Sequence, residues 1–342
     1  YYWSRNFDWN SRMIFNSGIT STGSYLPKKK MDNIELSKLC GIPANEIFMK
    51  TGIKFRRIAE KDETASMMGL KASKDAIKRS KLNKNDIDLV ICCSFSGDYI
   101  YPALACKITQ LLGLKDPGCF DVMANCTGFQ TGIDIAFEKV KNSKGLKNIL
   151  VVAVAMQSRY INWKDPNSAI YFGDGASAAI VSRVKNGYGH LGSSMISNTA
   201  VYDAVRMRGG GSSFVTSNYL KVKNDQSYEV TGLEVWKQVV TNQPKNIKLA
   251  LKDAKLNLED IDFFIFHQAN ANLIKFLMHR LEIPAKKTHT TVHKYANTAD
   301  ASMGVTLHEA LIKKKIRKND IVLISGVGAG FVFGTSIMKW SY

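Results

Sequence analysis

The stretch AKLNLEDIDFFIF (residues 254–266) repeats the outline of an earlier stretch, SKLNKNDIDLVIC (residues 80–92). Each consists of a helix end, a polar turn and a continuous apolar run, which is typical of a strand buried on both faces. Asp86 and Asp260 occupy the same place in the two stretches, at an offset of 174 residues. One such unit can recur by chance, so the fold depends on whether the neighbouring segments recur as well.

Two further pairs of segments keep nearly the same offset. KNILVVAVA (residues 147–155) is matched by NDIVLISGV (residues 319–327), each a polar turn followed by an apolar strand. A helix rich in small residues begins after Cys126, and its counterpart begins at Asn297. Three units in the same order at a near-constant spacing predict an internal duplication. We therefore expect two α/β halves in which strands alternate with helices.

The duplication divides the chain into residues 13–185, which carry Cys126, and residues 186–342, which carry His267 and Asn297. Residues 1–12 are interpreted as an upstream or vector-derived remnant, with Met13 as the true start. Between the halves, residues 187–220 contain three consecutive glycines and many serines, so we expect loops and a substrate-side insertion there rather than core. Residues 234–253 predict a helix.

Composition narrows the class of protein. The 342 residues are 45% apolar, enough for one large core or two smaller ones. No apolar run approaches the roughly 18–20 residues of a membrane span, and the start lacks a signal-peptide layout, so we expect a cytoplasmic protein without membrane contact. The six cysteines form no CxxC pair and the histidines lack ligand spacing. We therefore expect reduced thiols and no metal site.

The net charge of +18 comes from 47 basic and 29 acidic residues, with basic runs at residues 28–30, 286–287 and 313–318. Aromatic residues do not alternate with these runs and no nucleic-acid-binding motif is present, so nucleic acid is not expected as a partner. Such runs are most often solvated faces. They can also steer an acidic partner protein or a phosphorylated cofactor, and charge alone does not choose between these roles.

Cys126 lies in FDVMANCTGFQTGIDIA (residues 120–136), where an apolar strand leads into a helix. The free N–H groups and the positive dipole end of a helix start favour a thiolate over a thiol. This position is typical of a nucleophile, but a buried and inert cysteine is as common an outcome. The stretch alone leaves both interpretations open.

Three further segments carry candidate polar groups. His267 ends an apolar strand, a place that faces the ligand crevice in α/β proteins, although most lone histidines are ordinary core or surface residues. Asn297 is interpreted as either a helix N-cap or, through the duplication, a partner of Cys126. GVGAGFVFG (residues 326–334) is a glycine turn followed by a strand, which argues against a dinucleotide loop. It is either a simple tight turn or a source of backbone N–H groups for an oxyanion.

Together these segments resemble the thiolase superfamily, and most closely the β-ketoacyl-[acyl-carrier-protein] synthase III family, from about residue 18 to the C-terminus. The resemblance implies a thiolase-like fold, with two duplicated α/β halves, central mixed sheets and a layered α/β/α/β/α arrangement. The matching motifs are TGSYLP (22–27), KTGIKFRRIA (50–59), DVMANCTGF (121–129), FGDGASAA (172–179), HQAN (267–270), ANTADAS (296–302) and GAGFVFG (328–334).

The resemblance also implies an activity. Cys126 would accept an acyl group from acyl-coenzyme A, and His267 and Asn297 would assist the decarboxylative Claisen condensation with a malonyl thioester. The backbone N–H groups of Cys126 and Gly330 would bind the oxyanion. The malonyl group would arrive on acyl carrier protein or coenzyme A, and the product would start a fatty acid or a specialised ketide. No cofactor would be needed beyond the coenzyme A of the substrate, and the enzyme would be a homodimer.

Substrate contacts are implied for Lys50 with coenzyme A, for Phe331, and for Tyr101, which in the family reaches across the dimer to close the acyl pocket. This sequence departs from the family in three ways that bear on the substrate. Asn125 stands where a small residue is usual, which predicts an unusual choice of acyl chain, and Tyr101 favours a short or polar acyl group. The usual carrier-docking arginine after HQAN is absent; Ala271 and Asn272 stand there.

Two other functions remain open at this point. An acyltransferase on the same scaffold would pass the acyl group from Cys126 to an oxygen or nitrogen nucleophile without releasing CO2. A non-catalytic relative that only binds a carrier protein or another partner would form no acyl adduct on Cys126.

Overall fold

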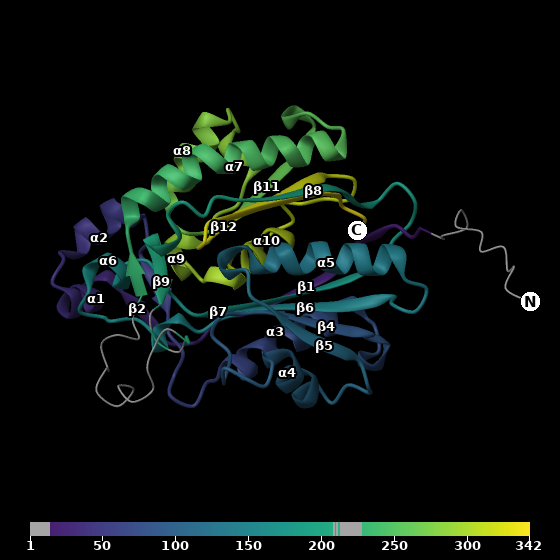
Figure 1. Cartoon of the computed structure of the whole chain (residues 1–342), viewed down its shortest axis with the longest axis horizontal. Coiled ribbons are helices and arrows are strands. Elements are labelled where there is room, and N and C mark those ends of the chain that lie inside the picture. The colour runs from purple at the N-terminus through teal and green to yellow at the C-terminus, as the bar shows by residue number, and fades with distance from the viewer. Residues whose placement is uncertain (1–13, 208, 210, 213–227) are drawn as a thin grey trace, which may run out of the picture.

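The computed structural model describes residues 14–207, 209, 211–212 and 228–342, so the proposed remnant at residues 1–12 and most of the glycine-rich middle lie outside the described residues. Two sheets are stacked with helices below, between and above them, which confirms the layered α/β/α/β/α arrangement (Figure 1). The first sheet contains, in spatial order, β1 (Ser17–Tyr25), β7 (Gly175–Arg183), β6 (Asn148–Ala155), β4 (Leu89–Cys93) and β5 (Gly118–Val122). The second contains β8 (Gly189–Ser197), β13 (Val332–Lys339), β12 (Ile321–Gly328) and β11 (Phe263–Phe266).

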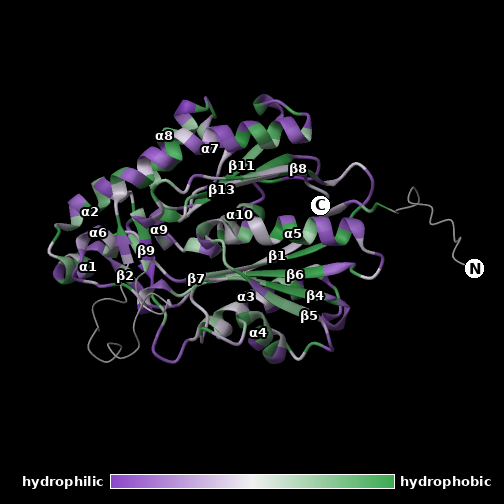
Figure 2. Cartoon of the chain, viewed as in Figure 1, coloured by the Kyte–Doolittle hydropathy of each residue, from purple (hydrophilic) through white to green (hydrophobic). Residues whose placement is uncertain are grey.

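Helices cover both faces of each sheet. α5 (Gly128–Asn142) and α10 (Ser302–Ile312) lie between the sheets and contact strands of both. α3 (Ala65–Ser80) and α4 (Leu104–Leu112) cover the outer face of the first sheet, and α7 (Gly232–Ala254) with α8 (Ala271–Arg280) covers the second. Figure 2 shows apolar residues concentrated on the strands and hydrophilic residues along the outer helices.

Shorter elements surround the site end of the molecule. They are β2 (Lys30–Asp32), α1 (Asn33–Cys40), α2 (Ala44–Thr51), β3 (Phe55–Arg57), α6 (Pro166–Ala169), β9 (Val205–Met207), β10 (Tyr228–Val230) and α9 (Val292–Tyr295). Single 3₁₀ turns join many elements: η1 (Lys84–Asp86), η2 (Asn125–Thr127), η3 (Gln157–Arg159), η4 (Tyr202–Ala204), η6 (Leu258–Asp260), η7 (Ala285–Lys287) and η8 (Ala299–Ala301).

The two sheets repeat one pattern of strand pairing, as the duplicated sequence predicts. β4 and β6 pair in parallel, as do β11 and β12, and an antiparallel strand follows on the same side in each sheet. In the second sheet an isolated parallel bridge from Phe264 to Thr288 stands where β5 pairs with β4 in the first. The two halves therefore share one topology, but within the residues that the structure describes only the first half develops a fifth strand.

Equivalent polar groups hold the repeated turns. η1 and η6 both start with a capping box, formed by Asn83 with Asp86 and by Asn257 with Asp260. Two residues further on, Asp88 accepts N–H groups at the start of β6, and Asp262 accepts the N–H of Ile321 at the start of β12. The shared polar turn of the two stretches thus fixes the spacing between neighbouring parallel strands.

One prediction about the middle of the chain is wrong. Residues 187–220 include β8, which pairs with β13 along its whole length and so belongs to the second sheet. Its Gly189, Gly192 and serines lack the apolar run that marks a buried strand, which is why composition indicated a loop. Gly192 is required there because a Cβ atom would come within 2.5 Å of the Ala254 backbone at the end of α7. The division of the chain at residues 185 and 186 stays a prediction.

The largest apolar cluster lies between the sheets, where α5 and α10 are packed. Phe137 and Phe129 of α5 are fully buried there, together with residues of strands from both halves. α5 buries one face, which includes Ile133, Ala136 and Val140, while α10 is buried along almost its whole length. Because the same layer is shared by both sheets, it connects the halves through their cores.

Replacing Phe137 with alanine is expected to lower the free energy of unfolding by about 3–5 kcal/mol, since it leaves a cavity in this shared layer. Phe276→Ala on α8 removes a ring that is 38% exposed, so it should cost only on the order of 1 kcal/mol. Urea unfolding followed by circular dichroism measures both. Equal losses for the two variants would contradict a core shared between the sheets.

Candidate active site

Cys126 occupies the middle of η2, between the end of β5 and the start of α5. Ala124 O accepts hydrogen bonds from the Thr127 N–H at 3.1 Å and from its hydroxyl at 2.7 Å. Asn125 adopts a left-handed backbone with φ of 47°, a conformation that asparagine tolerates better than most residues. The turn is therefore held on both sides of the thiol, and the helix begins two residues later, as the sequence predicts.

The glycine turn of the second half, which contains Gly328 and Gly330, packs directly against the turn that holds Cys126. A Cβ atom on Gly328 would lie 2.8 Å from Ala124 O and 3.3 Å from Cys126 N, so only glycine allows this approach. One residue further, Ala329 O accepts a hydrogen bond of 3.2 Å from Asn125 Nδ2. The contact brings Gly330 to the same side of the thiol, where it lines a cavity together with Cys126.

His267 follows the last residue of β11 and is 6% exposed. Its Nδ1 lies 2.6 Å from Ser302 Oγ, and the same oxygen accepts the Gln268 N–H at 3.4 Å. Ser302 Oγ accepts the backbone N–H and can donate its own hydroxyl hydrogen to Nδ1, an arrangement that corresponds to the tautomer with the ring proton on Nε2. Burial lowers the pKa of His267 to about 3, so the ring is neutral near pH 7.

Asn297 is held in an equally defined orientation. Its Oδ1 accepts the Ala299 N–H at 2.8 Å, so the Nδ2 group is the end of the amide that remains able to donate. Its backbone carbonyl accepts the Gln157 amide at 2.6 Å, and its N–H donates to Tyr171 O at 2.9 Å. The segment is thus tied to the first half on both sides of the side chain.

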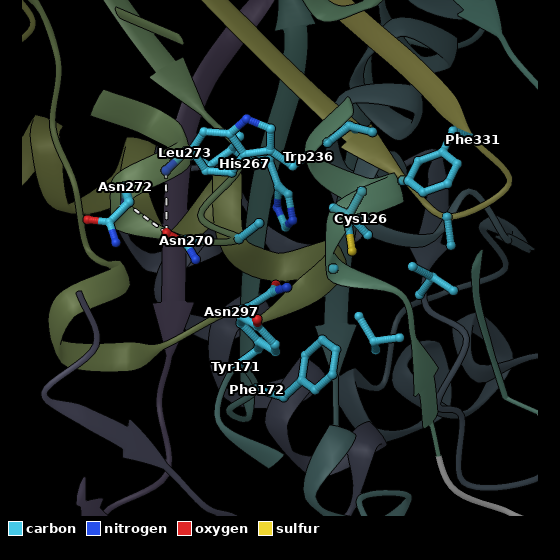
Figure 3. Close-up of a pocket in the computed structure, with 18 of the residues that line it drawn as sticks. Cys126, Tyr171, Phe172, Trp236, His267, Asn270, Asn272, Leu273, Asn297 and Phe331 are labelled. Atoms are coloured by element: carbon cyan, nitrogen blue, oxygen red, sulfur yellow. Dashed lines mark hydrogen bonds between the residues drawn. The ribbon is translucent and has the colours of Figure 1, made fainter. Parts of the chain in front are cut away.

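These three side chains face one cavity of about 400 Å³ (Figure 3). Cys126 comes from the first half, while His267 and Asn297 come from the second, as the duplication predicts. Two N–H donors beside a sulfur nucleophile can stabilise negative charge on an oxygen of a group bound next to the sulfur. Cys126 also lines a second cavity, of about 290 Å³, which contains Asn125 and Gly330.

One expectation about the thiol is wrong. The helix start was expected to favour a thiolate, but burial raises the pKa of Cys126 well above its ordinary value and outweighs the small opposing effect of its backbone N–H. Asp300 adds to this rise only when ionised. Its carboxyl is fully buried, and this burial raises its own pKa strongly, which favours the neutral form. The resting group is a thiol.

The three residues predicted to contact the substrate lie in different environments. Phe331 is buried and lines the first cavity. Lys50 also lines this cavity, and its ammonium group pairs with Glu46 at 2.6 Å. Tyr101 is 84% exposed and lines neither cavity of this chain.

The residues that orient His267 and Asn297 were not identified from the sequence. Ser302 lies inside the quoted ANTADAS motif, so a signal was present, but its role depends on contact with His267 across 35 residues. Gln157 follows β6 and carries no motif, yet its amide donates to both Gly173 O and Asn297 O. Only the folded chain shows these contacts.

Within the described ranges, His, Cys, Asp and Glu side chains do not gather in groups of three or more that could hold a metal ion. Among the helices described, none combines the length and the apolar character needed to cross a membrane.

A cysteine at the junction of two duplicated α/β halves, facing a histidine and an asparagine amide, defines a thiolase-like condensing enzyme that transfers acyl groups. Residues 120–199 match the family model described as 3-oxoacyl-[acyl-carrier-protein (ACP)] synthase III, and residues 251–340 match the model of its C-terminal part. The chain belongs to the β-ketoacyl-[acyl-carrier-protein] synthase III family.

Relatives support this membership over nearly the whole chain. β-Ketoacyl-[acyl-carrier-protein] synthase III of Fusobacterium nucleatum is 36% identical over 327 residues, covering 95% of this chain and 99% of that protein. The crystal structure of 3-oxoacyl-[acyl-carrier-protein] synthase III from Aquifex aeolicus VF5 is 30% identical, with a TM-score of 0.87 over 95% of this chain and 100% of that one. The priming β-ketosynthase from the R1128 polyketide pathway is 27% identical, with a TM-score of 0.89 over 96% and 97%.

The neutral His267 predicts a pH dependence of stability. The unfolded chain exposes this residue with a pKa near 6.5, whereas the folded value is about 3, so between these values only the unfolded state binds the proton. The stability that the neutral His267 ring contributes to the folded state is therefore fully present above pH 6.5. It is lost as the pH falls toward 3, by at most about 1.4 kcal/mol per pH unit. His267→Gln should reduce the slope of the free energy of unfolding against pH, and His279→Gln, an exposed control, should not. Identical slopes for wild type and His267→Gln would contradict the buried neutral ring.

Proposed function

We propose that this enzyme transfers an acyl group from acyl-coenzyme A to Cys126 and then condenses it with a malonyl thioester, releasing CO2 and a β-ketoacyl thioester. The observation that carries the proposal is the fixed orientation of two donors beside the thiol. Asn297 Oδ1 and His267 Nδ1 are each occupied by a hydrogen bond from within the protein, so Nδ2 and Nε2–H are directed to the substrate. Two donors aimed at one oxygen are suited to an enolate.

In the first step Cys126 Sγ attacks the thioester carbonyl, and coenzyme A leaves. The bond to the sulfur of coenzyme A breaks as the bond to Cys126 forms, and the proton of the Cys126 thiol ends on the released coenzyme A. The backbone N–H groups of Cys126 and Gly330 bind the oxyanion of the tetrahedral intermediate. The approach of Gly328 to Cys126 N supports this role, because it brings the glycine turn to the thiol.

In the second step the malonyl thioester loses CO2, and the electron pair of the broken bond forms an enolate. Asn297 Nδ2 and His267 Nε2 stabilise its oxygen by hydrogen bonding. The enolate carbon attacks the acyl carbonyl on Cys126, which releases the sulfur and regenerates the thiol after protonation. A neutral histidine suits this step, because it donates a hydrogen bond without placing a buried charge beside the enolate.

The partners follow from the same site. Lys50 at the cavity and Phe331 in its wall are proposed to contact the incoming thioester. The malonyl group arrives on acyl carrier protein or coenzyme A. The side-chain amides of Asn270 and Asn272 donate hydrogen bonds to the backbone carbonyls of Lys50 and Met49. Asn272 stands in the region where the family's docking arginine is expected. Coenzyme A therefore stays an equal alternative to acyl carrier protein as the malonyl carrier. No metal or redox cofactor takes part in either step.

We propose that two copies of the chain form a homodimer through β5. This strand is one edge of the first sheet, with β1 at the other, and large apolar side chains are exposed next to it: Tyr99, Ile100, Tyr101 and Met123. Exposed apolar residues beside an unpaired edge favour pairing with a second copy. Tyr101 of each copy would then complete the acyl cavity of the other, which fits its exposure in the single chain.

We further propose that the enzyme acts in the cytoplasm and starts fatty-acid or specialised ketide synthesis. The thiols are consistent with a reducing compartment. Cys106 and Cys119 lie with their sulfur atoms 3.4 Å apart without forming a disulfide bond.

Incubating the enzyme with acyl-coenzyme A should add the acyl mass to the intact protein, and Cys126→Ala should abolish this adduct because it removes the nucleophile. Cys106→Ala, which removes an exposed thiol, should acylate normally. Mass spectrometry before and after addition of malonyl thioester measures both steps. An adduct that malonyl thioester does not discharge would favour transfer to an oxygen or nitrogen nucleophile, and an adduct retained by Cys126→Ala would refute the assignment.

Asn297→Ala is expected to keep self-acylation and to slow condensation by roughly 10²–10³-fold, the usual effect of removing one donor to an oxyanion. Asn272→Ala is the matched control, since this amide lines the same cavity but is bonded to backbone carbonyls. Release of CO2 from malonyl thioester and single-turnover acylation separate the two steps. Unchanged condensation in Asn297→Ala would remove this residue from the mechanism.

A further inference from the structure

The second cavity, of about 290 Å³, lies next to Cys126 and is mostly apolar, with Phe95, Met123 and Phe172 among its walls. Under the proposed function it receives the acyl chain attached to Cys126 Sγ. Several polar side chains also line it: Asn125, Gln157, Tyr202, Arg206 and Tyr228. Which of them has a hydrogen-bonding group left for a substrate decides what kind of acyl chain fits.

Most of these groups are engaged by the protein itself. Gln157 donates to two backbone carbonyls and accepts the Tyr228 hydroxyl at 3.3 Å. The Arg206 guanidinium pairs with Glu229 at 2.7 Å and with Asp203 at 2.6 Å. Because two carboxylates already face Arg206, the cavity is not arranged to bind an acyl chain that ends in a carboxylate.

Tyr202 is 65% exposed, whereas Asn125 is half-buried directly beside the thiol. Ala329 O can only accept, so the amide atom that faces it at 3.2 Å is Nδ2, and the other end of the amide is Oδ1. No residue in the described part of the chain donates to Oδ1. This oxygen belongs to the residue directly before Cys126, and its side chain lines the same cavity as the thiol. It is therefore an oriented acceptor beside the acyl chain.

We propose that Asn125 selects acyl thioesters that carry a hydrogen-bond donor, such as a hydroxyl group, on the third carbon of a short chain. A substituent on that carbon lies roughly 4–5 Å from the sulfur, by ordinary bond lengths, within reach of a side chain on the neighbouring residue. The apolar remainder of the cavity favours a short chain without further polar groups. This specificity rests on the proposed acylation of Cys126.

The test compares 3-hydroxybutyryl-coenzyme A with 3-methylbutyryl-coenzyme A, which differ by a hydroxyl in place of a methyl group. Initial rates of mass gain on Cys126 are measured for each. The wild-type enzyme should prefer the hydroxylated chain about 3- to 10-fold, the usual effect of one neutral hydrogen bond. Asn125→Gly, which keeps the left-handed backbone without strain, should bring the ratio to about 1. Because this change also removes the bond to Ala329 O, the ratio is the readout rather than either rate.

Tyr202→Phe is the matched control, because it removes a hydroxyl from the same cavity and keeps the ring. It should retain the wild-type ratio. A wild-type ratio of 1 or below, an unchanged ratio in Asn125→Gly, or loss of the preference in Tyr202→Phe would each overturn the assignment to Asn125. Absence of any adduct on Cys126 with both thioesters and with butyryl-coenzyme A would instead contradict the proposed function itself.

Discussion

The site depends on the close approach of two turns, one from each half of the duplicated chain. Gly328 lies against Ala124 O and Cys126 N at a distance that no side chain allows, and the Asn125 amide bonds to the next carbonyl. Neither half holds the site alone, since the first half supplies the thiol and the second supplies both donors. The shared layer of α5 and α10 keeps the two sheets in the register that this contact needs.

Much of the fold could be predicted because its signals are local and repeated. The polar turn with Asp86 or Asp260 and the apolar run after it indicate the same unit twice, and the strand pairing agrees. β8 was not predicted because its sequence, rich in glycine and serine, contains no apolar run. These small residues allow β8 to pack closely against α7. The three central side chains could be placed at element ends from sequence, but Ser302 and Gln157 act through contacts between distant segments, which no local pattern records.

The electrostatics of the site follow from burial rather than from the helix start. Burial shifts the pKa of the Cys126 thiol, the His267 ring and the Asp300 carboxyl toward the neutral form of each group. A neutral site is well matched to a reaction in which charge exists only briefly on a substrate oxygen, since preorganised N–H groups then act without competing ions.

The missing fifth strand of the second sheet has a consequence for assembly. The first sheet ends in β5, while its counterpart in the second half is reduced to a single bridge from Phe264 to Thr288. Among the described residues, β5 therefore has no equivalent edge strand in the second sheet. A chain with two such strands could add copies at both ends and grow into a filament, whereas pairing of β5 with the β5 of a second copy is isologous and closes after two copies. The proposed assembly through β5 therefore stops at a dimer.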